Sequence, residues 1–346
     1  MEDELNLMDE LNRMESQSKF EFDNVDEDVS DIEVPEWIPE TLSQREVVEE
    51  PVVGLGKIRR DTFDKDPIGL EKEWKNISPE NLPSRGFGYP DGFELAIKHA
   101  DVSEIRHYST IDETDRIDLD DKLNNILAKC MKIKWNGGFL DPLDLWYEDR
   151  FFIIMSIRDL TFIRGENRIM LPVTKNCTKP ECNIADQIEL KANLLDSFVM
   201  EPELLKRYDR ETFAFKMVPK DGSEEIDLFI PTVGVTTTCR KILRDKSKKG
   251  KKYDESFAEV CTFIISDWRN LNESLYDQYE RSSKDWSNLQ FSIADQVSKK
   301  ISFATKSRIF QTCNSCGGEV TAQITFPGGY RSLFVISDIF SQLLWY

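Results

Sequence analysis

Four of the seven cysteines stand in two close pairs, Cys177 with Cys182 and Cys313 with Cys316. Thiolates bind Zn²⁺ in fours, and a short turn delivers two sulfurs to one side of the ion. The spacing therefore predicts one structural zinc, held by all four side chains in a knuckle or ribbon-like element. The alternative is two reduced pairs in ordinary turns.

The two pairs differ in how well their spacing suits a metal. Gly317 and Gly318 follow the second pair, so the backbone can turn tightly there and leave amides that donate to sulfur. Four residues separate the cysteines of the first pair, and one of them is a proline, which fits a broader turn. About 130 residues lie between the pairs, so a shared site requires tertiary structure.

The remaining three cysteines are predicted to be buried core residues. Cys130, Cys239 and Cys261 sit among apolar neighbours and are expected in the core. The chain opens Met-Glu-Asp-Glu-Leu, without the basic and apolar regions of a secretory signal. Reduced thiols are therefore favoured over disulfides.

Acidic residues are concentrated at one end of the chain. The net charge is −19, and residues 1–50 hold 18 acidic and 3 basic side chains. Residues 1–66 are therefore predicted to be a disordered acidic arm, and residues 67–346 a nearly neutral body. Two apolar islands, 5–14 and 34–39, could fold on a partner, whereas an arm that only adds solubility is the alternative.

A basic run from Arg240 to Lys252 holds eight Lys and Arg around a single aspartate. A solvated loop is the first expectation for such a run. The competing hypothesis is an electrostatic dock for an acidic partner, for the chain's own arm or for phosphates. No run of eighteen apolar residues indicates a membrane span.

The hydrophobic pattern of the body mixes two periods, and this indicates an α+β fold of small sheets and helices. The body is expected to comprise parts 82–200, 201–304 and 305–346. We predict strands at 93–97 and 319–326, a hairpin over 212–230, amphipathic helices at 119–130, 257–268 and 289–301, and an apolar end at 333–346. The segment 149–162 is predicted to be a buried helix whose Arg150 and Arg158 need partners, Asp149 and Asp159 or groups on other helices.

The order of several short motifs carries a resemblance. Leu82-Pro-Ser-Arg-Gly leads to a Tyr-Pro pair and a strand, and Asp149-Arg150-Phe-Phe runs into Ile157-Arg158-Asp-Leu-Thr-Phe. A cysteine pair then precedes the Ile188-Glu-Leu strand, and Cys-x-x-Cys-Gly-Gly-Glu precedes a strand and an apolar tail. This order, over roughly 80–200 and 300–346, resembles the baseplate hub assembly proteins of T-even-type contractile-tailed phages.

The resemblance implies an architectural role and no catalytic residue. The protein would be a hub component or assembly factor that binds other tail proteins. It would act in the host bacterial cytoplasm while the tail is built, with the virion baseplate as a second location. The family leads us to expect Cys-x-x-Cys, and the wider spacing of Cys177 and Cys182 departs from that pattern.

Enzymatic patterns are missing from the sequence. His99 and His107 are the only histidines, and phosphate-binding, dinucleotide-binding and nucleophile-elbow motifs are all absent. We therefore predict that the protein is not an enzyme. A zinc-ribbon-type regulator that binds nucleic acid is the alternative function, but such a protein usually shows a strongly basic face.

Overall fold

The computed structural model describes residues 73–163, 168–175, 182, 187–195, 200–301, 308–313, 316–326 and 328–335. All of them belong to one compact unit, Gly56–Tyr346. Within these residues, helices accompany three small antiparallel sheets, which confirms the α+β class. The predicted acidic arm, with its apolar islands, lies outside the described residues.

The first sheet has the strand order β1-β2-β3-β4. Its strands are β1 (Lys75–Ile77), β2 (Glu94–Ile97), β3 (Met131–Trp135) and β4 (Gly138–Leu140). Leu95 lies opposite Ile133, and both side chains are buried, because alternate residues of each strand face the core. The predicted strand at 93–97 is confirmed as β2.

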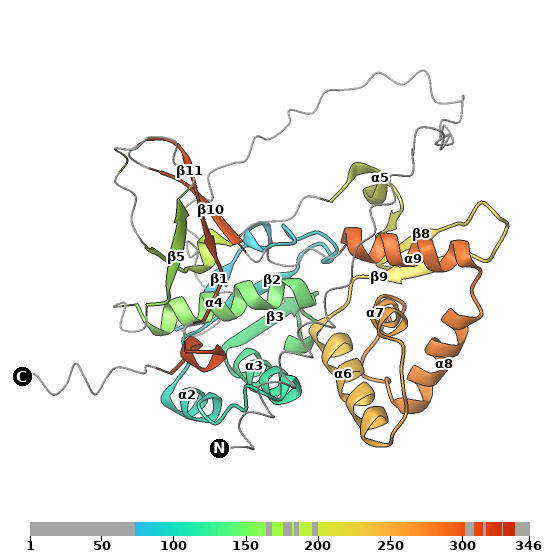
Figure 1. Cartoon of the computed structure of the whole chain (residues 1–346), viewed down its shortest axis with the longest axis horizontal. Helices are drawn as coiled ribbons and strands as arrows, with labels where there is room; N and C mark the ends of the chain where they lie inside the picture. Colours follow the sequence, from blue (N-terminus) through green and yellow to red (C-terminus); the bar gives the residue numbers. More distant parts are fainter. Residues whose placement is uncertain are drawn as a thin grey trace, which may run out of the picture. The chain divides into compact units, whose positions relative to one another are not determined.

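Three helices accompany this sheet, namely α2 (Val102–Tyr108), α3 (Arg116–Cys130) and α4 (Arg150–Thr161). The Asp115 carboxylate accepts the Ile117 amide at 2.8 Å, and this cap starts α3. Helix α4 is buried on most of its surface and matches the predicted segment 149–162. Figure 1 shows α4 and α3 in the green part of the chain, with the strands of this sheet beside them.

A second sheet joins strands from distant parts of the sequence. Its order is β10-β11-β5-β6, with β10 (Arg308–Thr312), β11 (Glu319–Gln323), β5 (Met170–Lys175) and β6 (Gln187–Glu189). Its apolar side chains belong to the same core as the first sheet. We call the described residues of 73–195 and 308–335 the first region.

Residues 200–301 form the second region, which has its own apolar clusters. It contains a sheet of β7 (Tyr208–Asp209), β8 (Ala214–Met217) and β9 (Ile226–Phe229), and the helices α5 (Pro202–Leu205), α6 (Val233–Lys248), α7 (Glu255–Phe263), α8 (Glu273–Lys284) and α9 (Asn288–Ile301). The predicted hairpin over 212–230 is confirmed as β8 and β9. Figure 1 shows α6 to α9 gathered beside this hairpin.

Backbone and side-chain bonds connect the two regions. Tyr147 donates its amide to the carbonyl of Pro231 at 2.9 Å, and Val233 donates its amide to the carbonyl of Leu145 at 2.8 Å.

Within the second region, Gly234 of α6 lies under the Trp268 ring, where an added Cβ would approach the indole to 2.4 Å. Only glycine leaves room for this contact.

Two expectations for the second region were wrong in detail. The basic run was expected to be a solvated loop, but α6 continues through it to Lys248. Acidic side chains on α3 and α8 form ion pairs with the basic run. These ion pairs stabilise the C-terminal part of α6, which the high density of positive charge did not lead us to expect. The predicted helix at 257–268 ends earlier, at Phe263, and the predicted helix at 289–301 is confirmed as α9.

Candidate metal centre

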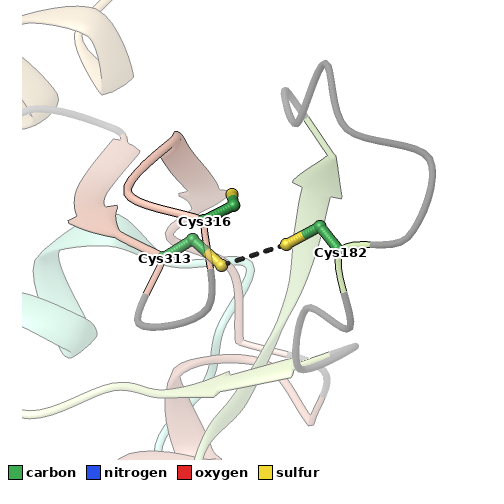
Figure 2. A group of neighbouring side chains, drawn as sticks. All are labelled: Cys182, Cys313 and Cys316. Atoms are coloured by element: carbon green, nitrogen blue, oxygen red, sulfur yellow. Dashed lines mark hydrogen bonds between the residues drawn. The ribbon is translucent and has the colours of Figure 1, made fainter.

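Three of the four predicted ligands lie together at one end of the second sheet. The sulfurs of Cys182, Cys313 and Cys316 all lie within 4.8 Å of one another, and the Cys182 and Cys313 sulfurs are 3.3 Å apart. Figure 2 shows Cys313 and Cys182 pointing toward one another from separate loops. The fourth predicted ligand, Cys177, lies outside the described residues.

Sheet register explains why cysteines so distant in sequence meet. Strand β11 runs antiparallel to β5, with Val320 opposite Lys175. The turn before β11 and the connection after β5 therefore lie at the same end of the sheet. Cys316 belongs to that turn, and Cys182 belongs to that connection.

The turn that carries the second pair has hydrogen bonds suited to bound thiolates. Cys313 donates its amide to the carbonyl of Gly318 at 2.7 Å, which closes the end of the hairpin. The Gly318 amide donates to the sulfur of Cys316 at 3.3 Å, and Gly317 adopts a φ of +71°. A positive φ is strained for residues with a side chain, so the Cys-Gly-Gly sequence suits this turn.

The sulfur positions fit a tetrahedral thiolate centre. Zn–S bonds of about 2.3 Å place two sulfurs about 3.8 Å apart, within the range that the three sulfurs span here. Cys313 is buried, and Cys182 and Cys316 are partly buried against the first core. The arrangement can hold a metal ion and fasten two loops together.

The three single cysteines are confirmed as core residues. Cys130, Cys239 and Cys261 are all buried. Burial raises the pKa of the Cys130 thiol to about 12, so the side chain stays protonated at neutral pH. Neither histidine ligates in the described cluster, and His99 lies beside Asp101 near solvent.

Motifs that carry the resemblance are joined in the structure. The Asp149 carboxylate accepts the amide of Ser84 at 2.9 Å and its hydroxyl at 2.7 Å, and also accepts the Tyr89 hydroxyl at 2.8 Å. Burial raises the pKa of Asp149 to about 6, although these hydrogen bonds oppose the shift. The turn at 82–90 is thereby fastened to the start of α4.

Of the partners predicted for Arg150, a group on another helix is confirmed and Asp149 is not the partner. The Arg150 guanidinium donates to the Asp120 carboxylate at 2.6 Å, and the same carboxylate accepts from Arg240 at 2.8 Å. Arg158 lies 3.7 Å from Asp159, as predicted. Sequence reasoning missed Asp120, although a signal existed. Asp120 lies at helical spacing from Leu127, and a carboxylate on an apolar stripe indicates a buried ion pair.

The basic run is largely neutralised by neighbouring acids. Lys246 is 4% exposed and lies 2.7 Å from Asp277 and 2.8 Å from Glu280. Burial works to lower the pKa of Lys246, but the hydrogen bonds to both carboxylates raise it overall. Lys249 and Lys251 share Glu273, so these cations connect α6 and the segment after it to α8.

No family model, curated protein or solved structure matches this chain. In the part of the chain that the structure describes, no helix is both long and apolar enough to cross a membrane.

Proposed function

We propose that Cys177, Cys182, Cys313 and Cys316 hold one structural Zn²⁺ in a ribbon-like element. The cluster of three sulfurs at the end of the second sheet carries this proposal. Four thiolates complete the coordination of zinc and leave no open position for a substrate. The ion would therefore fasten the β5–β6 connection to the β10–β11 turn, without a catalytic role.

Metal analysis tests the centre directly. Protein purified under reducing conditions should contain about one zinc per chain, and Cys316→Ser should lose it. Cys239→Ala is the matched control, because this cysteine is buried in the second region. A wild-type protein without zinc, or a Cys316→Ser variant that retains it, would contradict the proposal.

We further propose that the protein acts through protein contacts, as a hub component or assembly factor of a phage tail baseplate. The support is the order of its motifs, together with the contacts of Asp149 with Ser84 and Tyr89. The neutralised basic run argues against the nucleic-acid alternative, since its cations already face carboxylates.

Co-purification from infected bacteria tests this role. Tagged full-length chain should enrich tail proteins over a tag-only control, as identified by mass spectrometry. We expect the acidic residues 1–66 to contribute to this binding through electrostatic attraction. Deleting them should leave the zinc bound and weaken partner binding at low salt, with a smaller difference at high salt. Recovery of no tail protein would contradict the assembly role.

A further inference from the structure

A trough surrounds two arginines on the described surface. Arg116 begins α3 and Arg240 lies on α6, and both line each of three adjoining hollows of about 490, 350 and 370 Å³. We call these three hollows together the trough. No cysteine of the proposed metal centre lines it within the described residues.

Arg116 is the cation of this trough on which the docking argument rests. Arg116 is exposed and has no hydrogen bond or ion pair within the described part of the chain. Arg150 is 5% exposed, and its Nε lacks a hydrogen-bond partner there, although its other nitrogens bond Asp120. The Nε of Arg244, which also lines the trough, is buried, lacks a hydrogen bond and lies 3.9 Å from the Asp245 carboxylate. Both Nε atoms are buried from solvent, whereas the Arg116 side chain is accessible to an acceptor that a ligand supplies.

Apolar walls stand beside these cations. Phe151, Phe326 and Tyr330 line the 350 Å³ hollow together with Arg116 and Arg150. Aromatic rings next to guanidinium groups suit a ligand that carries both an apolar group and a carboxylate.

The distribution of acids decides between two kinds of anionic ligand. Glu148, Glu255 and Glu259 line the 490 Å³ hollow, and Glu148 and Asp120 line the 350 Å³ hollow, where Asp120 is bonded to Arg150 and Arg240. The lining of the 370 Å³ hollow contains four cations and no described acid. A phosphate backbone carries charge at every nucleotide and would be repelled at the glutamates. A peptide can place its carboxylates at the cations and its neutral side chains elsewhere.

From this trough we infer a docking site for a short acidic peptide segment of a partner protein, with carboxylates beside aromatic or aliphatic side chains. Arg116 binds a carboxylate of the peptide, and the aromatic wall packs against its apolar side chains. The inference rests on the proposed protein-binding role, and it specifies the chemical class of the segment that would bind. It is independent of the zinc.

Fluorescence anisotropy on the full chain tests the site. The probe is a labelled peptide, acetyl-Glu-Glu-Trp-Leu-Asp-Glu-amide, and its comparison replaces every acid by the matching amide. The acidic probe should bind at least tenfold more tightly than the amide probe, because charged hydrogen bonds are stronger than neutral ones. Its binding should weaken as salt rises.

Arg116→Gln should weaken the acidic probe about tenfold, which corresponds to about 1.4 kcal/mol. Arg106→Gln is the matched control, because Arg106 is an exposed arginine on α2 that lines none of these hollows. Equal binding by wild type and Arg116→Gln would overturn the site. A labelled oligothymidylate that binds more tightly than the peptide, in an Arg116-dependent manner, would overturn the peptide assignment. The zinc content of the same samples is measured as well. A variant that loses peptide binding but retains its zinc shows that the docking site and the metal centre are independent.

Discussion

In the first region, strands far apart in the sequence have to meet, whereas the second region folds from a contiguous stretch of chain. Strands β5 and β10 belong to one sheet, and residues 200–301 lie between them in the sequence. Bringing such distant segments together costs loop-closure entropy. The proposed metal centre lies where those segments join.

The second region uses ion pairs between neighbouring helices instead. Lys246 on α6 contacts two carboxylates on α8, and its ammonium lies 4.9 Å from the centre of the Tyr276 ring. These groups are close in sequence, so no metal is needed to gather them. The comparison teaches that ion pairs between neighbouring helices hold the second region together, whereas the proposed metal centre fastens the sheet of the first region.

The largest loss of stability is expected when one ligand of the proposed metal centre is removed. Cys313→Ser should destabilise the first region by about 2–5 kcal/mol, comparable with the loss of a native disulfide, because the two halves of its sheet lose their fastening. Hydrogen exchange should rise in β5, β6, β10 and β11 while α7 to α9 stay protected. Uniform exchange throughout the chain would show that the two regions do not differ in this way.

The next expected effect concerns the buried carboxylate on α3. Asp120→Ala should cost about 3–5 kcal/mol, because Arg150 would remain buried without its partner. Asp121→Ala is the neighbouring control, since the pair of Asp121 with Lys241 is half-exposed and should contribute less than about 1 kcal/mol. Urea unfolding measures both. Equal losses in the two variants would contradict the assigned role of Asp120.

A smaller loss is expected at the ion pairs of the second region. Lys246→Met should cost about 1–3 kcal/mol, because methionine fills the space of the aliphatic chain but leaves two carboxylates without this cation. Glu280 also pairs with Lys284, which limits the damage. Thermal unfolding compares this variant with Lys241→Met, whose partner is exposed. A larger loss for Lys241→Met would reverse the expected order.

Titration of Asp149 should produce the smallest effect. Its pKa is about 6 in the folded protein and 3.8 in the reference state, so the folded protein binds the proton first as pH falls. The burial cost of the charge is present above pH 6 and is relieved between about pH 6 and 4. Stability of wild type relative to Asp149→Asn should therefore rise by about 1 kcal/mol from pH 7 to pH 5. Zinc release affects both proteins equally, and a pH-independent difference would contradict the shift.

Local patterns predicted the fold best where burial and periodicity agree. The stripe ending at Cys130 predicted α3, and the alternation about Asp221-Gly222 predicted the β8–β9 hairpin. Helix α8 was not anticipated, because charged and polar residues outnumber the few apolar residues, Leu275, Tyr276 and Tyr279, that pack against the third apolar cluster. Polar helices of this kind are stabilised by neighbours that the local sequence does not reveal.

Residue types predicted the candidate site, but its geometry needed the sheet. The glycines after Cys316 indicated a tight turn, and the turn is present. The sequence near Cys182 does not predict that β11 pairs with β5, since strand pairing depends on tertiary contacts. The trough around Arg116 was also beyond sequence reasoning, because it is lined by segments from both regions.

Because the second region lies in the sequence between the two halves of the second sheet, the two pairs of cysteines are synthesised at different times. Cys182 and Cys313 are 131 positions apart. At about 5–20 residues per second, a ribosome needs roughly 7–26 s to add that stretch. During this interval the ribosome synthesises α6 to α9, and the second pair of cysteines is not yet available to bind a metal together with the first. The order of translation thus makes the proposed metal centre a late step in maturation.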